Sequence, residues 1–114
     1  MLSESQLAGF RSLLEQEQLD MRERLQTLDR RLARDDNFNE AEDLGDSAIQ
    51  VLNKEEFLFE RNQALERLEV IGQALQRIEN GNYGISEVSG KPIPAERLEA
   101  MPTATTLVGE RRHP

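Results

Sequence analysis

The stretch Asp35-Asp36-Asn37-Phe38-Asn39 separates two long runs of helical periodicity and thereby decides the fold. Asp and Asn side chains hydrogen-bond to nearby backbone groups in non-helical conformations, so they favour turns over helix interiors. The helical pattern resumes at about Ala48. A connector this short makes two consecutive long helices antiparallel. The sequence therefore predicts a helical hairpin.

The pattern before the connector is typical of one strand of a coiled coil. Ser3, followed by Gln6, predicts a capping box that opens the first helix. Apolar residues then recur at helical spacing, with a polar gap at Glu17 and Gln18. They are Leu7, Phe10, Leu14, Met21, Leu25, Leu28 and Leu32.

The pattern after the connector predicts the partner helix. Its apolar positions are Ala48, Val51, Leu52, Leu58, Leu65, Leu68, Ile71, Leu75 and Ile78. Gly81 predicts a left-handed helix stop. Residues 83–94 mix β-favouring residues with turn residues and predict a short β-hairpin, and residues 94–100 predict a short helix with Pro94 at its first position. We expect a mainly α fold, with an antiparallel coiled coil over 1–80 and a small globular end over 81–114.

Composition narrows the classes of function. The 114 residues carry a formal net charge of −8, which disfavours sequence-specific binding to nucleic acid and favours a protein partner with a basic cleft. The absence of cysteine excludes disulfides and thiolate metal sites. The N-terminus lacks the pattern of a signal peptide, so we expect a cytoplasmic protein that does not enter a membrane. His113, near the C-terminus, has no catalytic partners, and we expect no enzyme.

The predicted connector is acidic, and two interpretations of its carboxylates stay open. One or two of them cap the second helix and complement its dipole, or the hairpin presents them at its tip (residues 35–48) to a partner. Phe38 is expected to close the end of the hairpin against apolar side chains. The carboxylates are Asp35, Asp36, Glu40, Glu42, Asp43 and Asp46.

The segment Asp43-Leu44-Gly45-Asp46-Ser47-Ala48 resembles the D-x-x-D-x-A motif at the coiled-coil tip of the DksA/TraR family. The blocks Gln6–Arg11, Tyr83-Gly84, Gly90, Arg97–Ala100 and Pro102–Ala104 resemble the family's first helix and zinc-finger region. The resemblance implies a transcription regulator that inserts its coiled coil into the secondary channel of bacterial RNA polymerase and modulates initiation. It also implies that Asp43 and Asp46 approach the polymerase active site and that Ala48 belongs to the same motif.

The chain departs from the family where the zinc ligands would lie. Ser86, Ser89, Leu107 and Glu110 occupy the positions of the four cysteines. Hydroxyls, an aliphatic side chain and one carboxylate do not make a structural zinc site, so we expect no zinc and no other cofactor. We expect a small metal-free core, packed against the base of the coiled coil, to take the place of the structural zinc site. The available apolar residues are Ile85, Val88, Ile93, Leu98, Met101, Leu107 and Val108. Loss of zinc and thiols suggests a stress-response role, when zinc is scarce or oxidants are present.

Other functional questions remain open at this stage. Two positions where the family binds guanosine tetraphosphate correspond to Val70 and Met101, which cannot pair with a pyrophosphate. A Gre-type transcript-cleavage or anti-cleavage factor also uses an acidic coiled-coil tip, and a structural coiled-coil adaptor would use these acids for capping alone. A closed intramolecular seam leaves little apolar stripe for a partner helix, so we expect a monomer.

Overall fold

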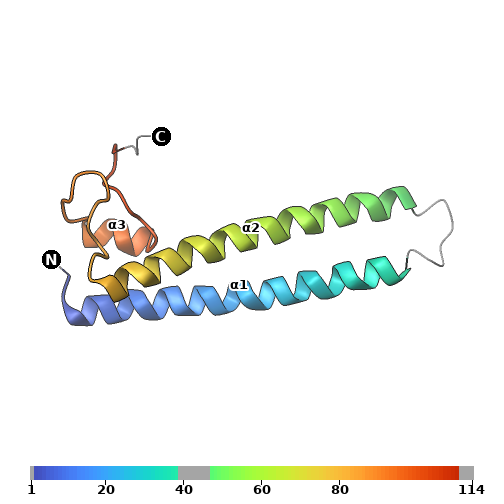
Figure 1. The fold of residues 1–114 in the computed structure, drawn as a ribbon, viewed down its shortest axis with the longest axis horizontal. Helices are drawn as coiled ribbons and strands as arrows, with labels where there is room; N and C mark the ends of the chain where they lie inside the picture. The colour runs from blue at the N-terminus through green and yellow to red at the C-terminus, as the bar shows by residue number, and fades with distance from the viewer. Residues whose placement is uncertain (1, 39–46, 111–114) are drawn as a thin grey trace. The chain divides into compact units, whose positions relative to one another are not determined.

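The computed structural model describes residues 2–38 and 47–110, and the side chains of residues 2–34 and 53–110. The chain order is α1 (Glu4–Phe38), α2 (Ser47–Asn80) and α3 (Ala95–Ala100) (Figure 1). The chain forms two compact units. Unit 1 comprises Met1–Gln18 with Val70–Pro114, and unit 2 comprises Leu19–Glu69. The predicted mainly α fold with a helical hairpin is confirmed.

The capping box at the start of α1 forms as predicted. The Ser3 backbone N–H donates to Gln6 Oε1 at 2.9 Å, and the Gln6 N–H donates to Ser3 Oγ at 3.0 Å. Two N–H groups that lack intrahelical partners are thereby satisfied. At its other end α1 continues to Phe38, beyond the predicted stop at Asp35. An established helix adds residues at little cost, and the small penalty of Asp and Asn does not end it.

The end of α2 is the left-handed stop that Gly81 predicts. Gly81 has φ +79°, a conformation that costs glycine nothing. Its N–H donates to Ile78 O at 3.2 Å, and the Asn82 N–H donates to Arg77 O at 3.0 Å. This is the Schellman arrangement, and it turns the chain out of the helix into the C-terminal segment.

The residues of α2 in the seam, that is, the residues that face α1, differ in part from the apolar positions predicted from the sequence. Ile71 is buried, with Leu68, Leu75 and Ile78 partly buried, as expected. Leu58 and Leu65 are instead 42% and 40% exposed. Ile78, Leu75, Ile71 and Leu68 lie at alternating steps of three and four residues. The same steps continue toward the start of α2 to Ala64, Arg61 and Phe57, which face the seam. The heptad register therefore overrides the greater hydrophobicity of the two leucines, which lie one position outside it.

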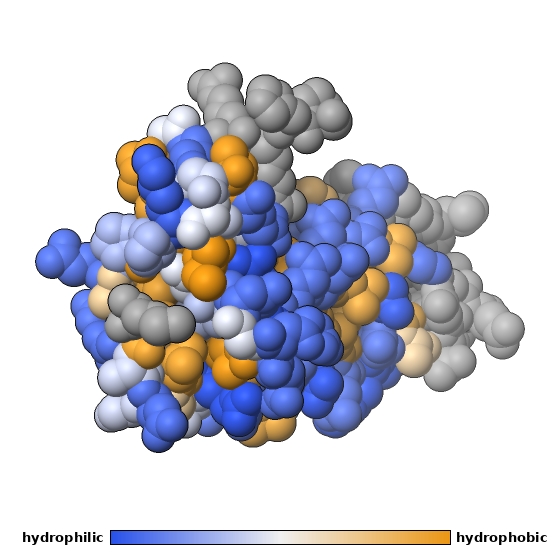
Figure 2. All heavy atoms as spheres, turned by 60° about the vertical axis from the view of Figure 1, so that its left-hand side comes forward, coloured by the Kyte–Doolittle hydropathy of each residue, from blue (hydrophilic) through white to orange (hydrophobic). Residues whose placement is uncertain are grey.

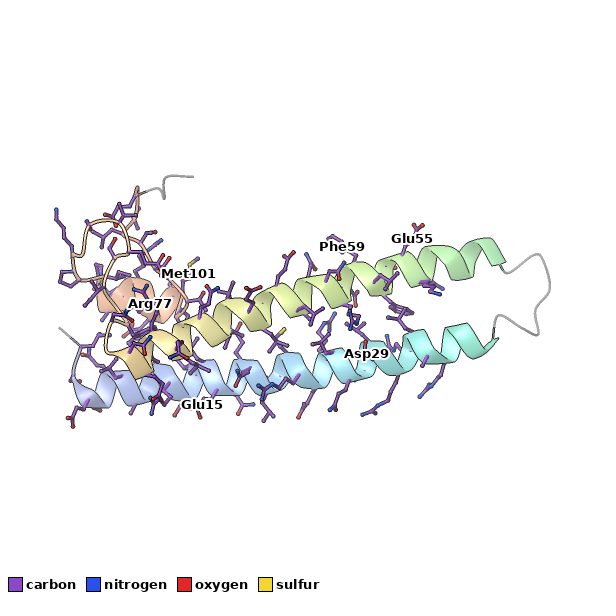
Figure 3. The ribbon with its side chains drawn as sticks, in the orientation of Figure 1. Glu15, Asp29, Glu55, Phe59, Arg77 and Met101 are labelled. Atoms are coloured by element: carbon purple, nitrogen blue, oxygen red, sulfur yellow. The ribbon has the colours of Figure 1, made fainter. Side chains whose placement is uncertain are left out.

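Unit 2 pairs its parts of α1 and α2 through a mixed apolar and charged seam. Leu28 and Ala64 are buried. Arg61 Nε donates to Asp29 Oδ1 at 2.7 Å, and Arg24 reaches Glu60 Oε2 at 3.1 Å. Asp29 points toward α2, whereas Glu55 and Phe59 point away from α1 (Figure 3). Such exposed ion pairs contribute about 0.2–1 kcal/mol each, so they set the register more than they set the stability.

Arg31 adds a contact between the same two helices. Its guanidinium carbon lies 5.7 Å from the centroid of the Phe57 ring, within the range of a cation–π interaction. Arg31 therefore takes part in the helix pairing of unit 2.

Unit 1 contains the larger core, which joins both helices to the C-terminal segment. The Phe10 and Tyr83 rings pack with their centroids 5.9 Å apart. On the face shown in Figure 2, apolar side chains form separate patches among hydrophilic ones. The buried apolar residues of unit 1 are Phe10, Leu14, Ile71, Ala74, Tyr83, Ile93, Leu98 and Ala104.

The structure of the C-terminal segment differs from several predictions. In the described residues the expected β-hairpin is reduced to one antiparallel bridge between Ile85 and Pro92. Pro92 and Pro94 have no N–H to donate, so a longer ladder does not form. The short helix α3 is confirmed, with Pro94 at its N-cap rather than its first helical position.

The predicted set of apolar core residues in the C-terminal segment is right only in part. Ile93 and Leu98 are buried, and Ile85 and Leu107 are partly buried. Val88, Met101 and Val108 are exposed, so their assignment to the core was wrong. Val88 lies in one turn of the chain and Val108 in another, where side chains project outward. None of the helices among the described residues is long and apolar enough to cross a membrane.

Candidate functional site

The tip residues implied by the family resemblance lie mostly outside the described residues. Asp43 and Asp46 precede the start of α2 and are not described. Ala48 belongs to the first turn of α2, but its side chain is outside the described set, as is that of Phe38. The capping and presentation interpretations of the tip carboxylates therefore both remain predictions.

The second group of predicted positions is described, and the structure brings it together. Glu110 Oε1 accepts a hydrogen bond from the Ser86 hydroxyl at 2.6 Å and another from the Leu107 N–H at 2.7 Å. Ser86 Oγ accepts from the backbone N–H groups of Val88 at 3.1 Å and Ser89 at 3.2 Å. All four positions that the family resemblance matches to zinc ligands thus belong to one hydrogen-bonded cluster, which we call the Glu110 cluster (residues 86, 89, 107 and 110).

The Glu110 cluster favours an ionised carboxylate. Hydrogen bonds from the Ser86 hydroxyl, the Ser89 hydroxyl and the Leu107 N–H lower the pKa of Glu110 below its ordinary value, with a further contribution from the charge of Lys91. Ser86 itself is only 3% exposed. A buried hydroxyl needs partners, and here each of its hydrogen-bonding positions is used.

A second polar anchor, Arg77, was not predicted from the sequence. Its side chain is 13% exposed, and one nitrogen pairs with Glu87 Oε1 at 2.6 Å. Its other terminal nitrogen donates to the carbonyl oxygens of Asn82, at 3.1 Å, and Ile85. Arg77 therefore ties the last turn of α2 to the chain that follows it (Figure 3). The available signal was a basic residue in the last turn of a helix.

Two further side chains fasten the stretch after α3. The buried Tyr83 hydroxyl donates to Pro102 O at 2.6 Å, and Arg97 Nε donates to Thr106 O at 2.9 Å. Burial raises the pKa of Tyr83 to about 12, against the opposing effect of the Arg77 charge. Tyr83 therefore stays a protonated donor throughout the physiological range.

Comparison with known proteins identifies the family. No family model matches the chain. The RNA polymerase-binding transcription factor DksA of Escherichia coli is 34% identical over 110 residues, which cover 94% of this chain and 70% of that protein. The chain belongs to the DksA/TraR family. The family resemblance predicted from the sequence is thereby confirmed.

Two other comparisons place the chain within the DksA/TraR family. The DksA of Caulobacter vibrioides is 42% identical over 72 residues, or 62% of this chain. The solved structure of transcription factor DksA2 from Pseudomonas aeruginosa superimposes with a TM-score of 0.83 and 27% identity, covering 93% of this chain and 80% of that one. The matches to the first curated relatives span only 26% to 51% of those proteins' length.

The residues of this DksA/TraR chain do not fit the zinc that the family resemblance implies. Ser86 and Glu110 are already hydrogen-bonded to each other. Leu107 contributes only a backbone N–H, which is a donor and cannot ligate a cation. Among the described residues no group of three or more His, Cys, Asp or Glu side chains is arranged to hold a metal. The cluster is therefore a hydrogen-bonded arrangement in its own right.

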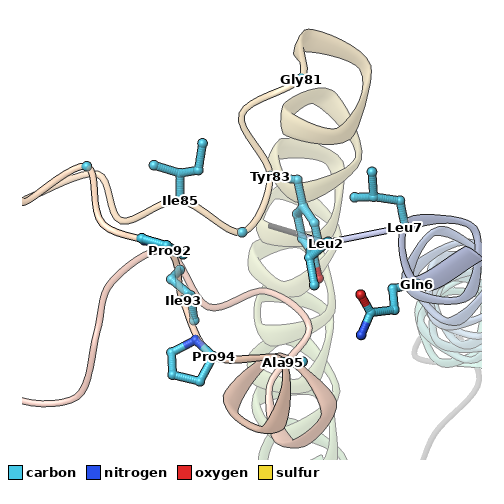
Figure 4. A pocket seen from close by; sticks show the side chains of 12 residues that line it. Leu2, Gln6, Leu7, Gly81, Tyr83, Ile85, Pro92, Ile93, Pro94 and Ala95 are labelled. Atoms are coloured by element: carbon cyan, nitrogen blue, oxygen red, sulfur yellow. The ribbon is translucent and has the colours of Figure 1, made fainter. Parts of the chain in front are cut away.

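Unit 1 also contains an apolar pocket of about 490 Å³ (Figure 4). Leu2, Leu7 and Gln6 line it from the N-terminal side, and Tyr83 and Ile93 from the C-terminal segment. A Cβ at position 84 would lie 2.9 Å from Leu2 Cδ1, and Gly84 has φ +82°. Position 84 favours glycine because its φ lies in the left-handed region, and a Cβ there would also displace the end of the Leu2 side chain. This pocket was not predicted, because its walls come from distant parts of the sequence.

Proposed function

We propose that this chain binds bacterial RNA polymerase and modulates transcription initiation by inserting its acidic hairpin tip into the secondary channel. The observation that carries the proposal is the 34% identity to the RNA polymerase-binding factor DksA over 94% of the chain. The helical hairpin and the D-x-x-D-x-A segment at its connector support it. The chain acts by binding, and the proposal includes no catalytic step of its own.

The proposed roles at the tip follow from charge and position. Asp43 and Asp46 approach the polymerase active site, and Ala48 keeps the adjoining surface small. An Asp at a helix N-terminus is held in a fixed direction by capping bonds, so capping and presentation act together. A recess lined by cations would attract such a tip and raise the rate of association.

The tip proposal is tested by the double substitution Asp43→Asn and Asp46→Asn. We expect the variant to keep its helical content and its pull-down of core polymerase but to lose its effect in an initiation assay. The matched control is Glu40→Gln with Glu42→Gln, which removes the same charge from neighbouring positions. Equal loss of activity in both variants would indicate a general charge effect, and no loss in either would indicate an adaptor. Release of short RNA 3′ fragments from a backtracked complex would indicate Gre-type action.

We further propose that the regulator works without zinc, as a monomer, when zinc is scarce or oxidants are present. The Glu110 cluster supports this proposal, because its polar groups satisfy one another without a cation. Stoichiometric zinc in the purified protein would contradict it.

A further inference from the structure

Residues 107–110 form a turn that is closed by its own two ends. The Glu110 N–H donates to Leu107 O at 3.1 Å, and the Leu107 N–H donates back to Glu110 Oε1 at 2.7 Å. Gly109, with φ +86°, makes the chain reversal possible. Both hydrogen bonds are local, so they shape the turn without fastening it to the rest of unit 1.

Hydrogen bonds from the turn at residues 86–90, chiefly the one from Ser86, fasten the turn at residues 107–110. A hydroxyl has one proton and two lone pairs. The N–H groups of Val88 and Ser89 occupy the lone pairs of Ser86, which leaves its proton for Glu110, 24 residues further along the chain. The Ser86 hydroxyl and the Leu107 N–H therefore both donate to Glu110, and a carboxylate, which only accepts, is the side chain that suits them.

We propose that the Glu110 carboxylate is a latch: it holds the turn at residues 107–110 against the turn at residues 86–90, and removing the carboxylate releases the two turns from each other. The inference goes beyond the proposed function, because it does not depend on the polymerase.

The rest of the C-terminal segment has other fastenings, so the latch opens locally. The Glu87 N–H donates to Thr105 O at 2.8 Å, the Tyr83 hydroxyl holds Pro102 O, and Arg97 holds Thr106 O. None of these three bonds involves a residue beyond position 106. Hydrogen bonds that protect different parts of a domain can open with different free energies, and a stretch fastened by one charged group opens first.

The latch is tested by amide hydrogen exchange of the full chain carrying Glu110→Ala. We expect exchange at Val88, Ser89 and Leu107 to become faster by about tenfold or more. The Glu87 amide, which donates to Thr105 O, should keep its rate. The matched control is Glu99→Ala, which removes an exposed carboxylate from α3 in the same segment and should change none of these rates.

Two patterns would overturn the latch. Acceleration at Leu107 alone would mean that Glu110 only caps its own turn, and acceleration that includes Glu87 would mean that it supports the whole segment. Ser86→Ala removes the principal donor to Glu110 and so weakens the latch from its other side. The Leu107 amide should then exchange faster although its own acceptor is intact, and an unchanged rate there would contradict the proposal.

Discussion

Glu110 faces groups that donate hydrogen bonds, and this lowers the pKa of its carboxyl group. The Ser86 hydroxyl contributes most, followed by the Ser89 hydroxyl and the Leu107 N–H, and Lys91 is the charged neighbour. A carboxyl whose pKa is lower in the folded than in the unfolded state stabilises the fold above its unfolded pKa. That stabilisation disappears as the pH falls through the folded pKa.

At the residue scale we therefore predict an acid-dependent contribution from Glu110. The free energy of unfolding of the wild type should exceed that of Glu110→Gln at about pH 7, and the difference should shrink as the pH approaches about 3. Denaturant titrations of both proteins across this range measure it. Glu99→Gln is the control for general charge effects. A difference that does not depend on pH would mean that the ionised form of Glu110 has no special stabilisation.

At the element scale, α1 offers a direct test of the seam register. Leu14 is fully buried, whereas its neighbour Leu13 is 55% exposed. Leu14→Ala should lower the free energy of unfolding by about 2–5 kcal/mol, because it leaves a cavity. Leu13→Ala, the matched control, should change it by about 0.5 kcal/mol or less. Thermal or denaturant unfolding of the two variants measures the difference, and equal losses would show that the register is wrong.

The helices could be predicted from the sequence because their signals are local. The capping box at Ser3, the stop at Gly81 and most of the apolar stripe each depend on residues a few positions apart. Leu58 and Leu65 differ from the prediction because the heptad register, and not hydrophobicity alone, determines which residues of α2 face α1. The exposed valines were misplaced for a different reason. Val88 and Val108 lie in turns. Burial in a turn depends on tertiary contacts, which leave no periodic pattern in the sequence.

The candidate site could be predicted only in part, for the same physical reason. The family resemblance singles out positions 86, 89, 107 and 110, and residue chemistry predicts that they do not bind zinc. Neither revealed that Glu110 accepts bonds from Ser86 and Leu107, since that depends on how two distant turns meet. Arg77 was missed because its partners are mostly backbone carbonyl groups, which have no signature in the sequence.

At the scale of the whole molecule, the Glu110 cluster predicts that a metal site can be built at the same place. Positions 86 and 89, like 107 and 110, have the C-x-x-C spacing of a zinc site, and hydrogen bonds bring the two pairs together. A variant with cysteine at all four positions should bind about one zinc per chain. Metal analysis measures this, with the wild type and a variant carrying Ser86→Cys and Ser89→Cys alone as controls. Zinc contents no higher than in these controls would show that the pairs are not correctly placed.

The division of the chain into two units has a consequence for its synthesis. Unit 2 is one continuous stretch, Leu19–Glu69, and can pair its helices as soon as that stretch leaves the ribosome. Unit 1 joins Met1–Gln18 to Val70–Pro114, so residues 1–18 must wait for a stretch that is made after unit 2. A nascent chain truncated before Tyr83 would leave Phe10 without its aromatic partner. The synthesis of residues 70–114 therefore controls when residues 1–18 reach their final place.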